Sequence, residues 1–96
     1  MARYQESRTY PRQSPDTCFA VAQTALRAAG FEVWKTRPIA WLALGTQKLP
    51  GDTVNANMMA RSGGQVTLSI GGDYTPPEVI NSLAQAIFTA FEAGLR

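Results

Sequence analysis

The sequence predicts an α+β domain in two layers, with both helices packed on one face of an antiparallel sheet. Residues 14–29 and 75–93 carry apolar side chains at helical spacing, and each stretch has proline near its start. Between these stretches, apolar and polar residues alternate as they do in half-buried strands. The expected order is helix, four antiparallel strands, helix, and a chain of 96 residues has the size of one domain.

Residues 1–13 are polar, and their pattern leaves two arrangements open. Tyr4, Glu6, Arg8 and Tyr10 recur at every second position, which fits a fifth strand at the edge of the sheet. Chain termini are also often poorly ordered, which fits a flexible tail. The chain therefore divides into this N-terminal segment and a single domain over residues 14–96, with the order (β)αββββα.

Both helices have recognisable starts. Ser14 is expected as the N-cap of the first helix, with Pro15 in its first turn, and Gly30 supplies the left-handed residue that ends it. The second start is a capping box in which Thr75 is the N-cap and Glu78 lies at N3. Each helix has one apolar stripe, comprising Cys18, Ala22, Ala25, Leu26 and Ala29 in the first and Ile80, Leu83, Ala84, Ile87 and Phe91 in the second.

The stretch from Gly30 to Ala43 is expected to form a hairpin that brings the two tryptophans together. A four-residue loop over residues 36–39 gives the pairs Phe31–Leu44, Val33–Leu42 and Trp34–Trp41. Both aliphatic pairs then share one face of the hairpin, and the two indoles share the other. A shift of one residue would mix the two sets, which favours this register.

A second hairpin is expected from residues 53–61 and 65–71 around the loop Ser62–Gly64. A three-residue loop gives the apolar pairs Ala60–Val66, Met58–Leu68 and Ala56–Ile70. Between the two hairpins, a loop over residues 49–51 places Trp41 beside Met59, and Met59 lies beside Thr67. The sheet is therefore expected to have one strongly apolar face, covered by the helices.

The opposite face of the sheet is the predicted interaction surface. Its row of Trp34, Trp41, Met59 and Thr67 crosses four strands, with Asn57 and Arg61 nearby. Large apolar side chains left in water usually mark a contact surface, and the expected partner is a protein. A second copy of the chain is the simplest such partner, because self-complementary patches favour twofold pairing.

Two alternatives for this face stay open. The N-terminal segment, with Tyr4 and Tyr10, could fold back and cover the tryptophans within one chain. The same face could instead bind a small ligand or single-stranded nucleic acid, whose bases stack on aromatic side chains.

With an N-terminal strand included, the order of elements resembles one repeat of the TATA-box-binding-protein-like fold. The resemblance lies in topology alone, because no functional motif of that family is matched in this sequence. It therefore implies an architecture and no activity.

The residue inventory argues against an enzyme and against a bound metal or cofactor. The chain has no histidine, which removes the commonest general base and a frequent zinc ligand. Cys18 lies on an apolar stripe, as a buried small hydrophobe does. Gly71, Gly72 and Thr75 precede a helix and could present amide groups to an anion, although they also fit a plain strand-to-helix turn.

Net charge and hydropathy indicate which partners and which cellular compartment to expect. The net charge is +2, and this excess falls within residues 1–12, so the folded part is close to neutral and argues against nucleic acid as the partner. The longest apolar run, residues 39–44, is too short to span a bilayer, and residues 1–17 contain no signal-peptide core. A single cysteine favours a reducing compartment, so the expected location is the cytoplasm.

Overall fold

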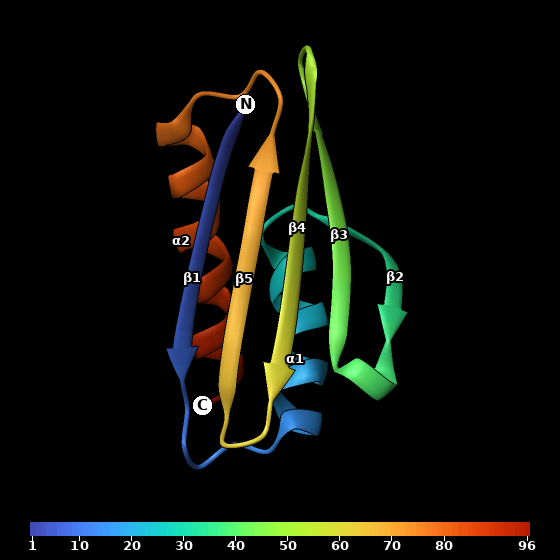
Figure 1. The fold of residues 1–96 in the computed structure, drawn as a ribbon, viewed down its shortest axis with the longest axis vertical. Helices are drawn as coiled ribbons and strands as arrows, with labels where there is room; N and C mark the ends of the chain where they lie inside the picture. Colours follow the sequence, from blue (N-terminus) through green and yellow to red (C-terminus); the bar gives the residue numbers. More distant parts are fainter.

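The computed structural model describes residues 1–96 as a five-stranded antiparallel sheet with two helices on one of its faces (Figure 1). The elements are β1 (Ala2–Thr9), α1 (Pro15–Ala28), β2 (Glu32–Arg37), the short 3-10 helix η1 (Pro38–Ala40), β3 (Leu42–Leu49), β4 (Asp52–Arg61), β5 (Gln65–Gly72) and α2 (Pro77–Gly94). The strands lie in the order β1-β5-β4-β3-β2. The predicted fold class and element order are confirmed, and the N-terminal segment is an edge strand rather than a tail.

The core lies between the helices and the inner face of the sheet. In Figure 1, α2 runs behind β1 and β5, and α1 runs behind β4 and β3. The largest fully buried side chains include Phe88 and Phe91 from α2, Leu26 from α1, Met58 from β4 and Leu68 from β5. Burying a side chain of this size contributes roughly 1.5–3 kcal/mol, so this layer supplies most of the stabilisation.

The first helix begins and ends as its sequence predicts. The Ser14 hydroxyl accepts a hydrogen bond from the Thr17 amide at 3.1 Å, and Pro15 follows it in the first turn. Gly30 has φ +92°, the left-handed conformation that glycine adopts most readily. The apolar stripe is buried as expected, except that Ala29 is only partly buried.

The second helix begins one residue later than predicted. Pro76 is the N-cap and makes no side-chain hydrogen bond to the helix. The expected cap, Thr75, directs its hydroxyl to the carboxylate of Asp52 instead. The capping-box prediction is therefore wrong: the helix begins after Pro76, and the Thr75 hydroxyl donates to a carboxylate of the neighbouring hairpin and accepts no hydrogen bond from a helix amide.

The hairpin of β4 and β5 has the predicted register. Ala60 pairs with Val66 and Met58 with Leu68, around a three-residue turn that ends at Gly64. Gly64 has φ +77°, and a Cβ atom there would lie 1.9 Å from the Tyr10 carbonyl oxygen. Position 64 therefore requires glycine, because a side chain there would collide with the backbone that follows β1.

The turn between β3 and β4 is one residue shorter than expected. Pro50 and Gly51 alone form it, with Gly51 at φ +80°, so Leu49 pairs with Asp52. The predicted cross-strand neighbour of Met59 is Trp41, whereas the observed one is Leu42.

This difference of one residue reverses the two faces of β3, because successive side chains point to opposite sides of a strand. Ala43 and Gly45 are buried against the helices, whereas Leu42 and Leu44 point outward and are half-buried. The predicted core position of the two leucines is wrong. The small residues fit the inner face because Phe31 fills the space there, and a Cβ on Gly45 would lie 3.3 Å from the Phe31 Cβ.

The predicted hairpin around the tryptophans is also wrong in register. Val33 pairs with Gly45, Lys35 pairs with Leu44, and the ladder has a bulge at Trp34 between them. The strands are joined by η1, so the indole pair does not form. Pro38 explains the longer connection, because its fixed φ and missing N–H suit the first turn of a helix and not a tight hairpin.

Substitutions of the two neighbouring turn glycines should differ strongly in cost. Gly63 has φ +84° with open space around it, so Gly63→Ala should cost about 1 kcal/mol from the left-handed backbone alone. Gly64→Ala adds the clash with the Tyr10 carbonyl and should cost about 3 kcal/mol. Urea unfolding of both variants measures the difference, and equal losses would contradict this account of the turn.

Candidate binding surface

The sheet has one face that no helix covers, and Figure 1 looks onto it. We call it the open face. Its side chains are Arg3, Gln5, Ser7 and Thr9 of β1; Gln65, Thr67 and Ser69 of β5; Thr53, Asn55, Asn57, Met59 and Arg61 of β4; Leu42, Leu44, Thr46 and Lys48 of β3; and Glu32, Lys35 and Arg37 of β2. Most of these residues are amides, hydroxyls or cations, as on a solvated sheet face.

Most residues of the predicted interaction surface do lie on the open face. Asn57, Met59 and Arg61 of β4 and Thr67 of β5 point outward, and Met59 pairs with Thr67 as predicted. Trp34 projects from the bulge of β2, with 58% of its surface exposed.

Trp41 is the predicted surface residue that the structure places elsewhere. It follows η1 in the left-handed conformation, with φ +48°, and its ring packs against the core. The indole Nε1 donates a hydrogen bond to Asp16 Oδ1 of α1 at 2.8 Å. Trp41 therefore anchors the η1 turn to the helical layer, and the predicted row of two tryptophans on one face is wrong.

The alternative in which the N-terminal segment covers the tryptophans is also excluded. β1 lies beside β5 at the edge of the sheet, and Tyr4 and Tyr10 face the helical layer. The open face is therefore left uncovered by every part of the chain.

Leu42 and Leu44 join Met59 and Trp34 in an apolar patch on the open face. Leu42 pairs with Met59, and Leu44 lies opposite Lys35, beside the bulge that carries Trp34. Leu42, Leu44 and Met59 are half-buried, yet none of them packs against the core. The two leucines were missed because the longer predicted turn turned them inward.

The cations of the open face have no partners within the chain. Arg3, Lys35, Arg37, Lys48 and Arg61 are all exposed, and the ion pairs of the structure involve only Arg8. Glu32 is the acidic side chain among them. The open face is therefore electropositive, although the chain as a whole is close to neutral.

The predicted anion site is filled by a carboxylate of the chain itself. Asp52 accepts hydrogen bonds from the amides of Tyr74 and Thr75 at 3.0 and 2.9 Å, and from the Thr53 amide at 2.9 Å. The hydrogen bond from the Thr75 hydroxyl, together with those from the amides, lowers the pKa of Asp52 to about 2. Gly71 and Gly72 are ladder residues of β5, so no free set of donors remains at this turn.

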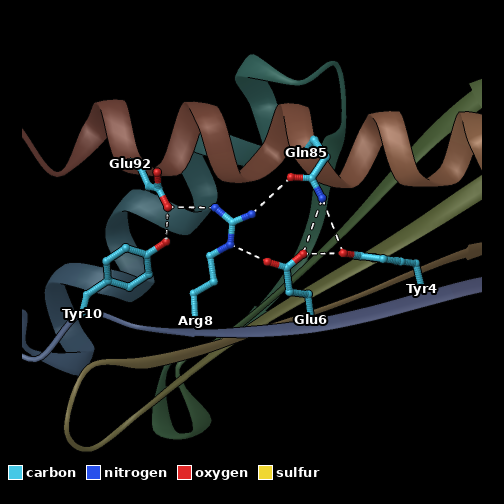
Figure 2. Close-up of polar contacts among 6 residues, drawn as sticks. All are labelled: Tyr4, Glu6, Arg8, Tyr10, Gln85 and Glu92. Atoms are coloured by element: carbon cyan, nitrogen blue, oxygen red, sulfur yellow. Dashed lines mark hydrogen bonds and ion pairs between the residues drawn. The ribbon is translucent and has the colours of Figure 1, made fainter.

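A polar network joins β1 to α2 on the helical side of the sheet (Figure 2). Arg8 bonds Glu6 of its own strand, and its guanidinium donates to Glu92 at 2.9 Å and to Gln85 at 3.1 Å. Tyr10 donates to the same Glu92 oxygen at 2.8 Å, which lowers the pKa of that carboxyl. The alternation of β1 revealed these side chains in the sequence, but their partners on α2 carry no sequence signal.

The network docks the edge strand and offers no reactive group. The hydrogen bond from Tyr4 and the ion pair with Arg8 lower the pKa of Glu6, and the Arg8 guanidinium lies 4.1 Å above the Phe88 ring. Both carboxylates in it, those of Glu6 and Glu92, already accept hydrogen bonds from these partners, as in a structural hydrogen-bond cluster.

Other chemistry is sparse. No three metal-binding side chains lie together, and burial raises the pKa of the Cys18 thiol. A hollow of about 350 Å³ at one end of the open face is lined by polar groups such as Gln5, Asn55 and Asn57. Neither helix has the length and apolar character that crossing a lipid bilayer requires.

Comparison with known proteins gives a distant structural likeness. No protein-family model and no curated protein matches the chain. The crystal structure of TTHA0849 from Thermus thermophilus aligns with 97% of this chain and 93% of its own, at 13% identity and a TM-score of 0.41. A likeness at this level carries no functional argument.

The Asp52 cluster should make stability depend on pH in the acid range. Because folding lowers the pKa of Asp52 to about 2, its stabilisation is complete above its ordinary pKa near 3.8 and is lost as the pH falls toward 2. Asp52→Asn should therefore lower the free energy of unfolding at neutral pH and flatten its fall between these pH values. Denaturant titrations across this range measure the effect. Asp73→Asn, in the same loop, is the matched control, and an equally flat profile for it would contradict the assignment.

Proposed function

We propose that this chain is a small non-enzymatic domain that docks a protein partner on the open face of its sheet. The observation that carries the proposal is the apolar patch of Trp34, Leu42, Leu44 and Met59. These side chains lie outside the core and, by the register of β2, β3 and β4, on the open face. An exposed apolar patch with a polar surround is the usual mark of a protein contact.

The composition of the patch and its surroundings supports a protein interface. Such interfaces have an apolar centre and a polar rim, and tryptophan, methionine and arginine are enriched in them. Trp34 and Met59 supply the apolar anchors, and Arg37 and Arg61 lie at the ends of the strands that carry them. The exposed tryptophan is the strongest candidate for a residue that dominates binding.

The charge of the open face favours a partner with an acidic surface. Lys35, Arg37 and Arg61 have no carboxylate within ion-pair distance, so they are free to pair across an interface. Two copies placed face to face would bring these cations together, and like charges in an interface cost affinity. A different protein, rather than a second copy, is therefore the occupant we propose for this face.

Single-stranded nucleic acid is the weaker alternative. Sheets that bind single strands stack the bases on aromatic side chains. Here the central strands present Asn55, Asn57, Thr67 and Ser69, and the exposed tryptophan lies in the edge strand β2.

The absence of catalysis is part of the proposal. The chain has no histidine, and Cys18 is buried with its pKa raised by that burial. Asp52, Glu6 and Glu92 are engaged by donors of the chain. With one buried cysteine and no disulfide, we propose that the domain binds its partner in the cytoplasm.

Open-face substitutions should weaken capture of the partner, while helical-face substitutions should not. Trp34→Ser should lower affinity roughly thirtyfold, since truncating an anchor costs about 2 kcal/mol. Lys35→Glu with Arg61→Glu should weaken binding and remove its salt dependence. Immobilised protein, a nuclease-treated extract of the native host and mass spectrometry identify the partner, and titration with the purified partner gives the affinities.

The controls lie on the helical side of the sheet. Val79 of α2 is an apolar residue with 40% of its surface exposed, so Val79→Ser matches Trp34→Ser, and Arg27→Glu matches the charge reversals. Circular dichroism must show that every variant is folded. Equal capture by wild type and open-face variants, or capture from an untreated extract that nuclease treatment abolishes, would overturn the proposal.

A further inference from the structure

The two edges of the sheet differ in how they resist the addition of another strand. β2 has six residues, its ladder has a bulge at Trp34, and Pro38 follows it directly. Short length, bulges and proline are the features by which proteins block edge pairing. β1 has eight residues, pairs with β5 in one unbroken register, and contains neither a bulge nor a proline. β1 is therefore the unprotected edge.

The register identifies the free backbone groups of β1. The Tyr10 amide donates to the Gly64 carbonyl at 2.7 Å, which extends the ladder between β1 and β5. In antiparallel pairs only alternate residues exchange hydrogen bonds with the neighbouring strand. The even-numbered residues of β1 therefore bond β5, and the odd-numbered residues Arg3, Gln5, Ser7 and Thr9 direct their N–H and C=O groups away from the sheet.

The side chains of β1 offer little repulsion to a neighbouring strand. Glu6 and Arg8 face the helical layer and form an ion pair with each other, and Arg8 also pairs with Glu92. Arg3 is the unpaired charge of the strand, and it lies near its start. Electrostatic repulsion therefore opposes the addition of a strand only at the start of β1.

We propose that a second copy of the chain adds to this edge, with the two β1 strands antiparallel about a twofold axis at Ser7. In this register Ser7 lies opposite Ser7 of the second copy, and Gln5 lies opposite Thr9. Glu6 of each copy lies opposite Arg8 of the other, and Tyr4 lies opposite Tyr10. Open-face residues meet open-face residues, which a continuous sheet requires.

The alternative registers are less complementary. A twofold axis at Glu6 places two carboxylates opposite each other, which is destabilising. An axis at Gln5 leaves Arg8 opposite Ala2 and loses both cross-copy ion pairs. The axis at Ser7 places Glu6 opposite Arg8 in both directions, and the hydrogen-bonded pairs Ser7–Ser7 and Gln5–Thr9 use the free backbone groups.

Proline and alanine at Ser7 separate backbone pairing from side-chain effects. Both substitutions remove the hydroxyl, which lies 2.8 Å from the Thr67 hydroxyl. Only Ser7→Pro also removes the outward N–H and fills the edge with its ring, while the bonds to β5 are kept. Sedimentation equilibrium over a wide concentration range should show dimers for wild type and Ser7→Ala and monomers for Ser7→Pro.

Cross-linking tests the register and does not depend on the fold of the proline variant. In an antiparallel hydrogen-bonded pair the Cα atoms lie about 5.5 Å apart, which a disulfide can bridge. Ser7→Cys should therefore form covalent dimers under mild oxidation, and Gln5→Cys should not. Cys18 is buried and serves as an inert background in both. A wild type that stays monomeric, or cross-linking at residue 5 in place of residue 7, would overturn the proposal.

Discussion

The two-residue turn of Pro50 and Gly51 decides which side chains of β3 face the core. It pairs Leu49 with Asp52 and thereby fixes the parity of the whole strand. A turn longer by one residue would direct Leu42 and Leu44 toward the helices, where Phe31 already fills the space. The same turn brings the Asp52 carboxylate to the amides before α2. The apolar patch of the open face and the entry to the second helix both depend on this turn.

The sequence predicts the parts of the fold that local chemistry determines. Residues 65–71 alternate without ambiguity and their turn contains glycine, so the register of β4 and β5 follows from the pattern. The stretch around Pro38 was less determined, because its apolar run from Ile39 to Leu44 fits either parity. In the structure, a bulge and a 3-10 helix shift the register of β2 against β3. Neither feature has a reliable signal in one sequence.

The residues of the candidate surface were also predicted correctly only where the local sequence pattern determines the register. Met59, Arg61, Asn57 and Thr67 were placed correctly because they lie on the well-patterned hairpin. Trp41 was misplaced because its hydrogen bond to Asp16 joins two distant segments, and no pattern within either segment reports it. Contacts of this kind depend on the packed structure, so their sequence positions alone could not reveal them.

The distribution of charge follows from how the carboxylates are used. Glu6 and Glu92 accept hydrogen bonds from Arg8, and Asp52 holds the loop before α2, so these carboxylates are committed on the helical side. Of the other carboxylates, Glu32 lies on a strand of the open face, and Asp73 lines the hollow at the end of that face together with Arg3. A chain with a net charge of only +2 thus becomes a domain with one electropositive face, because Glu6, Glu92 and Asp52 are used to secure β1 and the entry to α2. The unpaired cations of the open face are therefore the charges available to a partner.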